Sequence, residues 1–177
     1  MRTDIFNAFI VAAGEVLVSE ANLQITRGPL TLERDAYVTK DVSVLISLVG
    51  DVWGIAVISL SFETAKAITA RILDQEMTDF NELAQSGIGE LGNVVVGRAS
   101  TRLAEQGYRT DISVPTLIVG KGSRISTLGI DRLIVPLETE LGIIRLDLAL
   151  KGINAASEAS QANTSASANG TVPIRQR

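Results

Sequence analysis

The side chains best suited to chemistry in this chain are the carboxylate of Glu90 and the carboxamide of Asn93, three positions further on. Ser86 and Gly97 flank them with helical spacing. At about 100° per residue, all four positions fall within a sector of roughly 60° on one helical face. A carboxylate accepts hydrogen bonds, whereas an amide both donates and accepts them. This stripe could therefore hold a group of a partner molecule in place.

The composition leaves few other means of catalysis. The 177 residues include no histidine and no cysteine, which excludes Ser-His-Asp triads, Cys/His nucleophilic pairs and nearly all transition-metal sites. No disulfide framework can form either. Catalysis would have to rest on carboxylates, amides, hydroxyls, Lys or Arg, or on a cofactor that a partner supplies.

Charge and hydropathy exclude two further classes of protein. The net charge of −4 and a pI near 4.9 argue against nucleic-acid binding, which calls for a clustered basic surface. No apolar run approaches the roughly 20 residues of a membrane-spanning helix. The apolar N-terminal stretch contains Asp4 and Glu15, so it does not fit a signal peptide. We expect a cytoplasmic protein that binds neither nucleic acid nor membrane.

The helix that must position the polar stripe is predicted to begin at Asp79 and to end near Gln106-Gly107, where glycine suits a helix C-terminus. Its opposite face is apolar. That face carries Ile88, Leu91, Val95 and Ala99. Such a helix buries one side and presents the stripe on the other.

The remaining elements predict an α+β fold. One helix is expected to follow a Thr3 N-cap and end near Glu20, and another to span 62–73 after a Ser61 N-cap. Predicted strands fall within 23–38, 42–49, 52–60, 112–119, 132–137 and 143–150. In the last strand, Arg145, Asp147 and Ala149 alternate with aliphatic residues, which predicts one buried and one solvent-exposed face. This order favours a largely antiparallel sheet with the helices packed on one face.

The folded domain is predicted to span 1–152. Residues 154–171 include no Val, Ile, Leu, Met or aromatic residue, and such a segment cannot bury enough surface to offset the entropy lost on ordering. We expect 153–177 to be a disordered low-complexity tail.

Four other features have structural explanations. We expect Trp53 to lie in the core or at a dimer contact, and Gly97 to permit close backbone packing. Arg98 and Arg102 are expected to be solvated on the flank of the long helix, with the alternative that one of them reaches an acidic surface of a partner. The segment 120–123, Gly-Lys-Gly-Ser, lacks the spacing of a phosphate-binding loop and predicts a turn.

The pattern Ser-x3-Glu-x2-Asn-x3-Gly resembles a motif of the CheC/CheX/FliY phosphatase family of bacterial chemotaxis. The resemblance continues downstream through Leu103, Gly107 and the run Ile112-Ser113-Val114-Pro115 and covers roughly residues 1–150. One copy of the motif is most similar to CheX. The first helix contains Gly14-Glu15 but has Val18 where the amide would fall, so no second site is expected.

The resemblance implies a CheX/CheC-like fold and dephosphorylation of a phosphorylated CheY-like receiver. Asn93 would orient the attacking water, Glu90 would engage the lysine of the receiver, and Ser86 and Gly97 would support the site. The resemblance implies no cofactor of the chain's own, because Mg²⁺ would be bound by the receiver. It also implies a homodimer.

A second interpretation is a non-catalytic module of the same fold, which binds receivers or serves as a flagellar-switch-like scaffold. The intact pair of Glu90 and Asn93 counts against it, because a scaffold has no evident need for both side chains.

Overall fold

The computed structural model describes residues 2–127 and 129–152, so the predicted tail at 153–177 lies outside the described residues. Three helices are present in the described part: α1 (Thr3–Ala21), α2 (Phe62–Leu73) and α3 (Glu82–Glu105). The strands in the same part are β1 (Ile25–Arg27), β2 (Thr31–Glu33), β3 (Tyr37–Val38), β4 (Val42–Gly50), β5 (Val52–Leu60), β6 (Thr110–Ile112), β7 (Thr116–Val119), β8 (Arg124–Ile125), β9 (Arg132–Thr139) and β10 (Gly142–Gly152).

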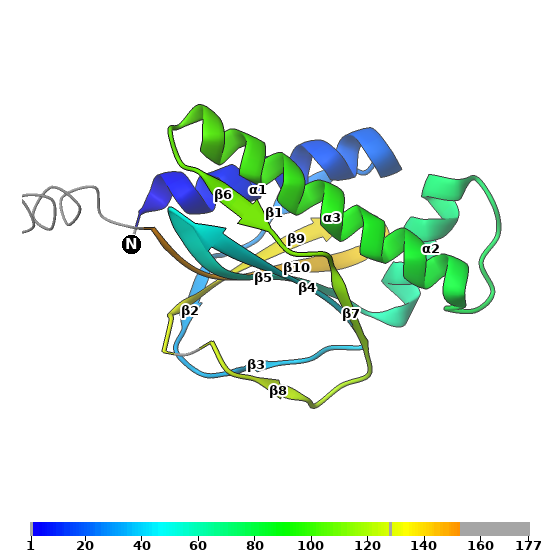
Figure 1. Cartoon of the computed structure of the whole chain (residues 1–177). Coiled ribbons are helices and arrows are strands. Elements are labelled where there is room, and N and C mark those ends of the chain that lie inside the picture. Colours follow the sequence, from blue (N-terminus) through cyan, green and yellow to red (C-terminus); the bar gives the residue numbers. More distant parts are fainter. Residues whose placement is uncertain (1, 128, 153–177) are drawn as a thin grey trace, which may run out of the picture.

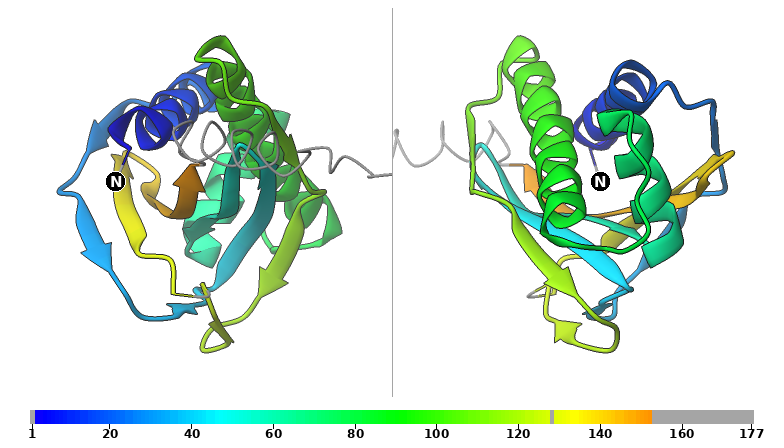
Figure 2. Two further views of the ribbon diagram at one scale, coloured as in Figure 1. Left: turned by 60° about the vertical axis from the view of Figure 1, so that its left-hand side comes forward. Right: turned by 90° about the vertical axis from the view of Figure 1, so that its right-hand side faces the viewer.

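The strands form one large antiparallel sheet and one small ribbon. The order in the large sheet is β1-β9-β10-β5-β4-β6, with β2 also paired to β9 and β7 also paired to β4. All three helices lie on one face of this sheet, and the β3–β8 ribbon lies beneath the other (Figures 1 and 2). This arrangement confirms the predicted α+β class with helices on one face.

The main core fills the space between the helices and the sheet. Phe9 from α1, Ile88 and Leu103 from α3, and Ile46 and Leu146 from the sheet are all almost completely buried there. Helix α3 carries its predicted apolar face inward. Periodicity of 3.6 in the helices and of 2 in the strands therefore predicted this layer correctly.

The middle of the second face of β10 is buried rather than exposed, which contradicts the prediction for this strand. Asp147 and Ala149 are both 0% exposed, because the β3–β8 ribbon covers this side of the sheet (Figure 1). The Asp147 carboxylate accepts hydrogen bonds from Arg132 at 2.5 Å and from Arg145 at 2.8 Å. Arg132 also pairs with Glu33 at 2.5 Å. This ionic network thus joins β9 and β10 to Glu33 of β2, the strand that precedes the β3–β8 ribbon.

Side-chain caps begin α2 and α3 but not α1, and two helix starts are shifted from the prediction. Ser61 caps α2 as expected and accepts from the backbone N–H three residues on at 3.1 Å. Asn81, not Asp79, caps α3, accepting from the N–H of Ala84 at 3.0 Å. Thr3 is the first residue of α1 rather than its cap. Several Ser, Asn and Asp residues can serve as caps, and packing decides which one does.

The predicted strand 112–119 is two short strands, so this prediction was wrong in detail. β6 and β7 both pair with β4, at different parts of its length. Between them, the Ser113 N–H donates to the Ser47 carbonyl at 2.9 Å, and its hydroxyl accepts from the Ser47 N–H at 3.0 Å. Pro115, which has no N–H to donate, falls in this break at the sheet edge.

Trp53 and the segment 120–123 were also the subject of predictions, and both lie outside the core. Trp53 is 40% exposed, with the ammonium of Lys151 5.7 Å from its ring centroid, so it is not a core residue. Gly120 and Gly122 have φ values of +118° and +92°, which only glycine adopts readily. The segment is therefore a turn, as predicted.

Close packing of α3 on the sheet occurs at Gly92 and not at Gly97. A Cβ at Gly92 would lie 2.7 Å from Cγ1 of the buried Val44, whereas a Cβ at Gly97 would meet nothing nearer than Ile112 at 4.0 Å. The expectation for Gly97 was therefore wrong. Periodicity cannot tell which glycine of a helix faces a neighbouring side chain at contact distance.

Replacing Gly92 with alanine should destabilise the protein, whereas Gly89→Ala should stabilise it. Overpacking costs about 1–3 kcal/mol, while alanine gains about 1 kcal/mol of helix propensity over glycine. A Cβ at Gly89 would meet nothing within 4 Å, so only the gain applies there. Urea denaturation of both variants measures the difference. Equal free energies of unfolding would contradict the close contact with Val44.

Candidate functional site

The polar stripe lies on the outer side of α3. Ser86 and Glu90 are exposed, and Asn93 and Gly97 are half-buried. The opposite side of the helix is buried against the core, with Ala99 at 0% exposure. The structure therefore places the four predicted residues along one accessible face of a single well-packed helix.

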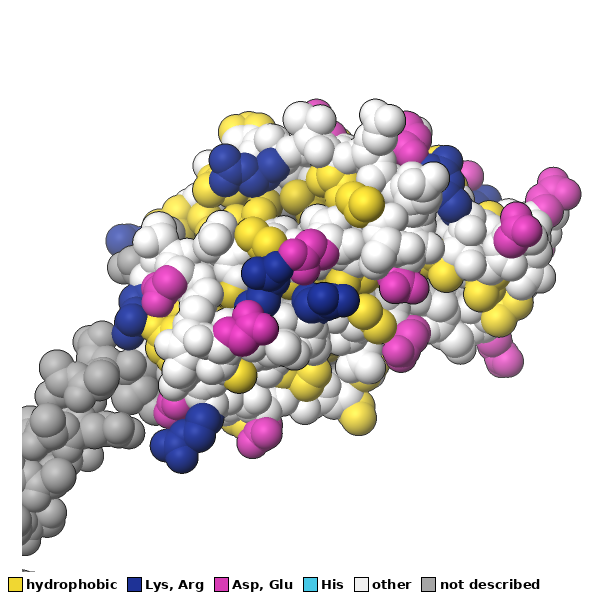
Figure 3. Space-filling model, turned by 90° about the horizontal axis from the view of Figure 1, so that it is seen from above, with side chains coloured by type: hydrophobic (Ala, Val, Ile, Leu, Met, Phe, Trp, Pro, Cys, Tyr) yellow, Lys and Arg dark blue, Asp and Glu magenta, His cyan; other side chains and the backbone are white. Residues whose placement is uncertain are grey.

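Glu90 and Asn93 have no intramolecular partners in the described part of the chain. Neither side chain forms a hydrogen bond or ion pair there. A carboxylate and an amide one helical turn apart remain free to bind a group from outside. The face formed by the helices carries cationic and anionic side chains interspersed with apolar ones (Figure 3), a mixture suited to contact with another protein.

A polar contact between helices fixes α3 in place. Arg102 forms an ion pair with Glu15 of α1, and Arg98 lies 4.0 Å from the same carboxylate. The prediction that these arginines are solvated was wrong for Arg102, which is only about a third exposed and joins the two helices, whereas Arg98 is about half exposed. Gly14-Glu15 was noted in the sequence, but the pairing of Glu15 depends on the helix crossing, which no local pattern reveals.

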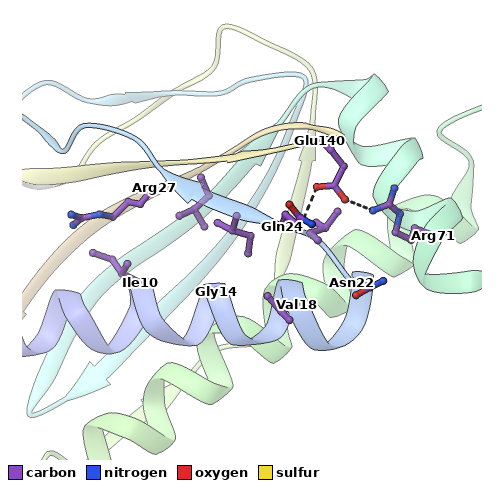
Figure 4. A pocket seen from close by; sticks show the side chains of 11 residues that line it. Ile10, Gly14, Val18, Asn22, Gln24, Arg27, Arg71 and Glu140 are labelled. Atoms are coloured by element: carbon purple, nitrogen blue, oxygen red, sulfur yellow. Dashed lines mark hydrogen bonds and ion pairs between the residues drawn. The ribbon is translucent and has the colours of Figure 1, made fainter.

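The corresponding part of α1 carries no comparable free pair. Glu15 is engaged by Arg102, and Val18, which stands where an amide would fall, is 52% exposed. Gly14 and Val18 line an open groove of about 960 Å³ between α1 and β1. At one end of the groove, Glu140 pairs with Arg71 at 2.5 Å (Figure 4). Helix α1 therefore offers no free carboxylate and amide to a partner, because Glu15 is paired with Arg102 and an apolar side chain stands at position 18.

Within residues 2–127 and 129–152, no three His, Cys, Asp or Glu side chains gather closely enough to hold a metal ion. None of the helices described has the length and apolar character needed to cross a membrane.

Comparisons with known proteins identify the family of this chain. Residues 42–138, more than half of the chain, match the family model described as chemotaxis phosphatase CheX. A protein of Thermotoga maritima named CheY-P phosphatase CheX is 29% identical over 131 residues, which cover 73% of this chain and 84% of the relative.

Solved structures of the same fold cover nearly the whole described part. A CheC-like superfamily protein from Shewanella sp. PV-4 has a TM-score of 0.78 and 27% identity, covering 86% of this chain and all of the other. CheX of Borrelia burgdorferi, solved in a complex of CheX, CheY, BeF₃ and Mg²⁺, has a TM-score of 0.73 and 29% identity over 85% of this chain and 99% of its own. The chain belongs to the CheX family of chemotaxis phosphatases.

Proposed function

We propose that this protein hydrolyses the aspartyl phosphate of a phosphorylated CheY-like receiver. The observation that carries the proposal is the exposed, unpartnered pair of Glu90 and Asn93 on α3. The relative named CheY-P phosphatase and the CheX–CheY complex of Borrelia burgdorferi support a receiver as the partner.

Hydrolysis of an aspartyl phosphate can be accelerated by an amide and a carboxylate, because the receiver itself carries the phosphoryl group that is attacked. Phosphoryl transfer is catalysed mainly by positioning and charge stabilisation, with little covalent work by the protein. The Asn93 amide would accept from and donate to the attacking water, which places the water in line with the scissile P–O bond. An amide does not titrate near neutral pH, so it orients the water without removing its proton.

Glu90 would anchor the receiver by pairing with its lysine, and Mg²⁺ would be bound by the receiver. Ser86 lies one turn before Glu90 and would support this contact. Gly97 has space around its Cα. Because it has no side chain, a partner could approach the backbone of α3 closely at this position. The protein would then contribute half of a site that the docked receiver completes.

The test of this function follows phosphate loss from a panel of phosphorylated receiver domains in Mg²⁺, with and without the protein. We expect faster loss from at least one receiver at catalytic amounts of protein. If the protein binds a phosphorylated receiver but leaves its phosphate lifetime unchanged, the chain is a binding module instead.

Glu90→Gln should weaken receiver binding more than it slows the bound reaction. Loss of one charged partner of a desolvated ion pair costs about 2–5 kcal/mol, so KM should rise at least tenfold. Glu105→Gln is the matched control, because Glu105 is an exposed glutamate at the far end of the same helix. Equal KM values for the two variants would remove Glu90 from the interface.

Homodimerisation stays a prediction. The outer edges of β6 and β7 on one side of the sheet, and of β1 and β2 on the other, pair with no strand in the described residues. Exposed strand edges need a cover, and a second copy of the chain would supply one. Light scattering coupled to gel filtration measures the oligomeric state.

A further inference from the structure

A second, smaller pocket lies on the sheet face turned away from the helices. It has a volume of about 220 Å³, and its lining includes Lys40, Lys121, Arg145 and Ser59. Ser59 and Arg145 are directly opposite each other on β5 and β10, and their neighbours Ile58 and Ile144 belong to the helix-side core. Alternation along the strands therefore places both on the other face.

The pocket is lined by three cations and one carboxylate. Lys121 pairs with Asp41 at 3.0 Å, and the Lys40 ammonium has no partner in the described part of the chain. Arg145 donates from Nε and Nη2 to Asp147, both at 2.8 Å, and its Nη1 makes no hydrogen bond to a described residue. Asp147 thus holds the guanidinium in place while both N–H groups of Nη1 stay available.

Ser59 supplies an independent sign of a missing partner. The residue is 1% exposed, and its Oγ is buried with no hydrogen-bond partner among the described residues. Buried hydroxyls are normally hydrogen-bonded, because leaving one unsatisfied is costly. A ligand oxygen in this pocket would provide the acceptor that Ser59 lacks.

We propose that this pocket binds a compact phosphate-type dianion. Its oxygens would accept from the ammonium groups of Lys40 and Lys121, from Arg145 and from the Ser59 hydroxyl, since charge-assisted hydrogen bonds of this kind are the strong ones. The volume is below the range of about 300–1,000 Å³ for drug-sized ligands, so it suits a phosphate with a short substituent.

The test titrates the full chain with inorganic phosphate, and separately with glycerol phosphate, at constant ionic strength kept with chloride. Backbone amide NMR shifts are followed. We expect saturable shifts at 40–43, 59–61 and 120–122. Tighter binding of glycerol phosphate would identify a phosphomonoester as the ligand, and equal or tighter binding of inorganic phosphate would identify free phosphate. Shifts that only rise linearly with both probes would overturn the proposal.

Lysine variants inside and outside the pocket distinguish binding at this specific site from a general attraction of anions to positive charge. Lys40→Gln and Lys121→Gln should each weaken phosphate binding about five- to tenfold, whereas Lys151→Gln, which removes a lysine of β10 outside the pocket, should not. Ser59→Ala should lower affinity without lowering Tm, because no protein contact is lost. Equal loss of affinity in all three lysine variants would overturn the proposal. No receiver is present, so the outcome is independent of phosphatase activity.

Discussion

Replacing Asn93 with alanine is expected to slow phosphate release from a phosphorylated receiver by about 10²–10³-fold, with little change in receiver affinity. Removing one preorganised polar group that acts on the reacting atoms costs about 3–4 kcal/mol of transition-state stabilisation. Asn93 is half-buried on the outer side of α3 and has no partner in the described chain, so folding should be unaffected. Single-turnover rates at saturating protein separate this loss from any loss of binding.

Two further variants make the Asn93 prediction specific. Asn93→Asp keeps the shape but replaces the amide donor with a carboxylate, which should repel the phosphoryl group and give a rate no faster than the alanine variant. Gln106→Ala removes an exposed amide just beyond the end of the same helix and should leave the rate unchanged. A wild-type rate in Asn93→Ala would exclude the proposed role of the amide.

Replacing Asp147 with alanine is expected to lower the free energy of unfolding by about 3–5 kcal/mol. The change leaves Arg145 without its carboxylate and Arg132, whose side chain is 3% exposed, with Glu33 alone. Removing one partner of a buried ionic network leaves uncompensated buried charge. Since domains are stable by only about 5–15 kcal/mol, Tm should fall on the order of 10 °C. Urea denaturation and calorimetry measure both quantities.

An exposed ion pair provides the matched control for Asp147. Asp131 lies 3.4 Å from Arg34, and both side chains are well exposed, so Asp131→Ala should cost at most about 1 kcal/mol. Replacing the buried pair together, Arg132→Met with Asp147→Leu, should be less harmful than Asp147→Ala alone. The deeply buried Arg132 guanidinium is then removed with its partner, and only the more exposed Arg145 and Glu33 lose theirs. A loss in Asp147→Ala no greater than in Asp131→Ala would contradict this account.

The sequence predicted the α3 face well because that prediction needed only one helix. Ser86, Glu90, Asn93 and Gly97 share a side at 3.6 residues per turn whatever the helix packs against. Once Ile88 and Leu91 face the core, the polar stripe must face outward. The antiparallel sheet followed equally from local signals, since the predicted strands 42–49 and 52–60 are separated by only two residues and pair as β4 and β5.

Errors arose where two distant segments meet. The alternation along β10 predicted a solvent-exposed face, because no local pattern shows that the β3–β8 ribbon crosses beneath it. In the same way, α3 needs glycine at Gly92 because Val44 approaches there, and Arg102 is held by Glu15 from 87 positions away. Each depends on long-range contacts that strand and helix periods do not encode.

The sequence by itself thus determined the type of chemistry available, the helix that carries Glu90 and Asn93, and the side of that helix that faces outward. These properties follow from composition and from the geometry of one element. Only the tertiary structure decided that the two side chains remain unpaired, that α1 has its Glu15 committed to Arg102, and that cations gather around Ser59 on the far face. These depend on which surfaces meet, because partners for buried and charged groups come from other parts of the chain.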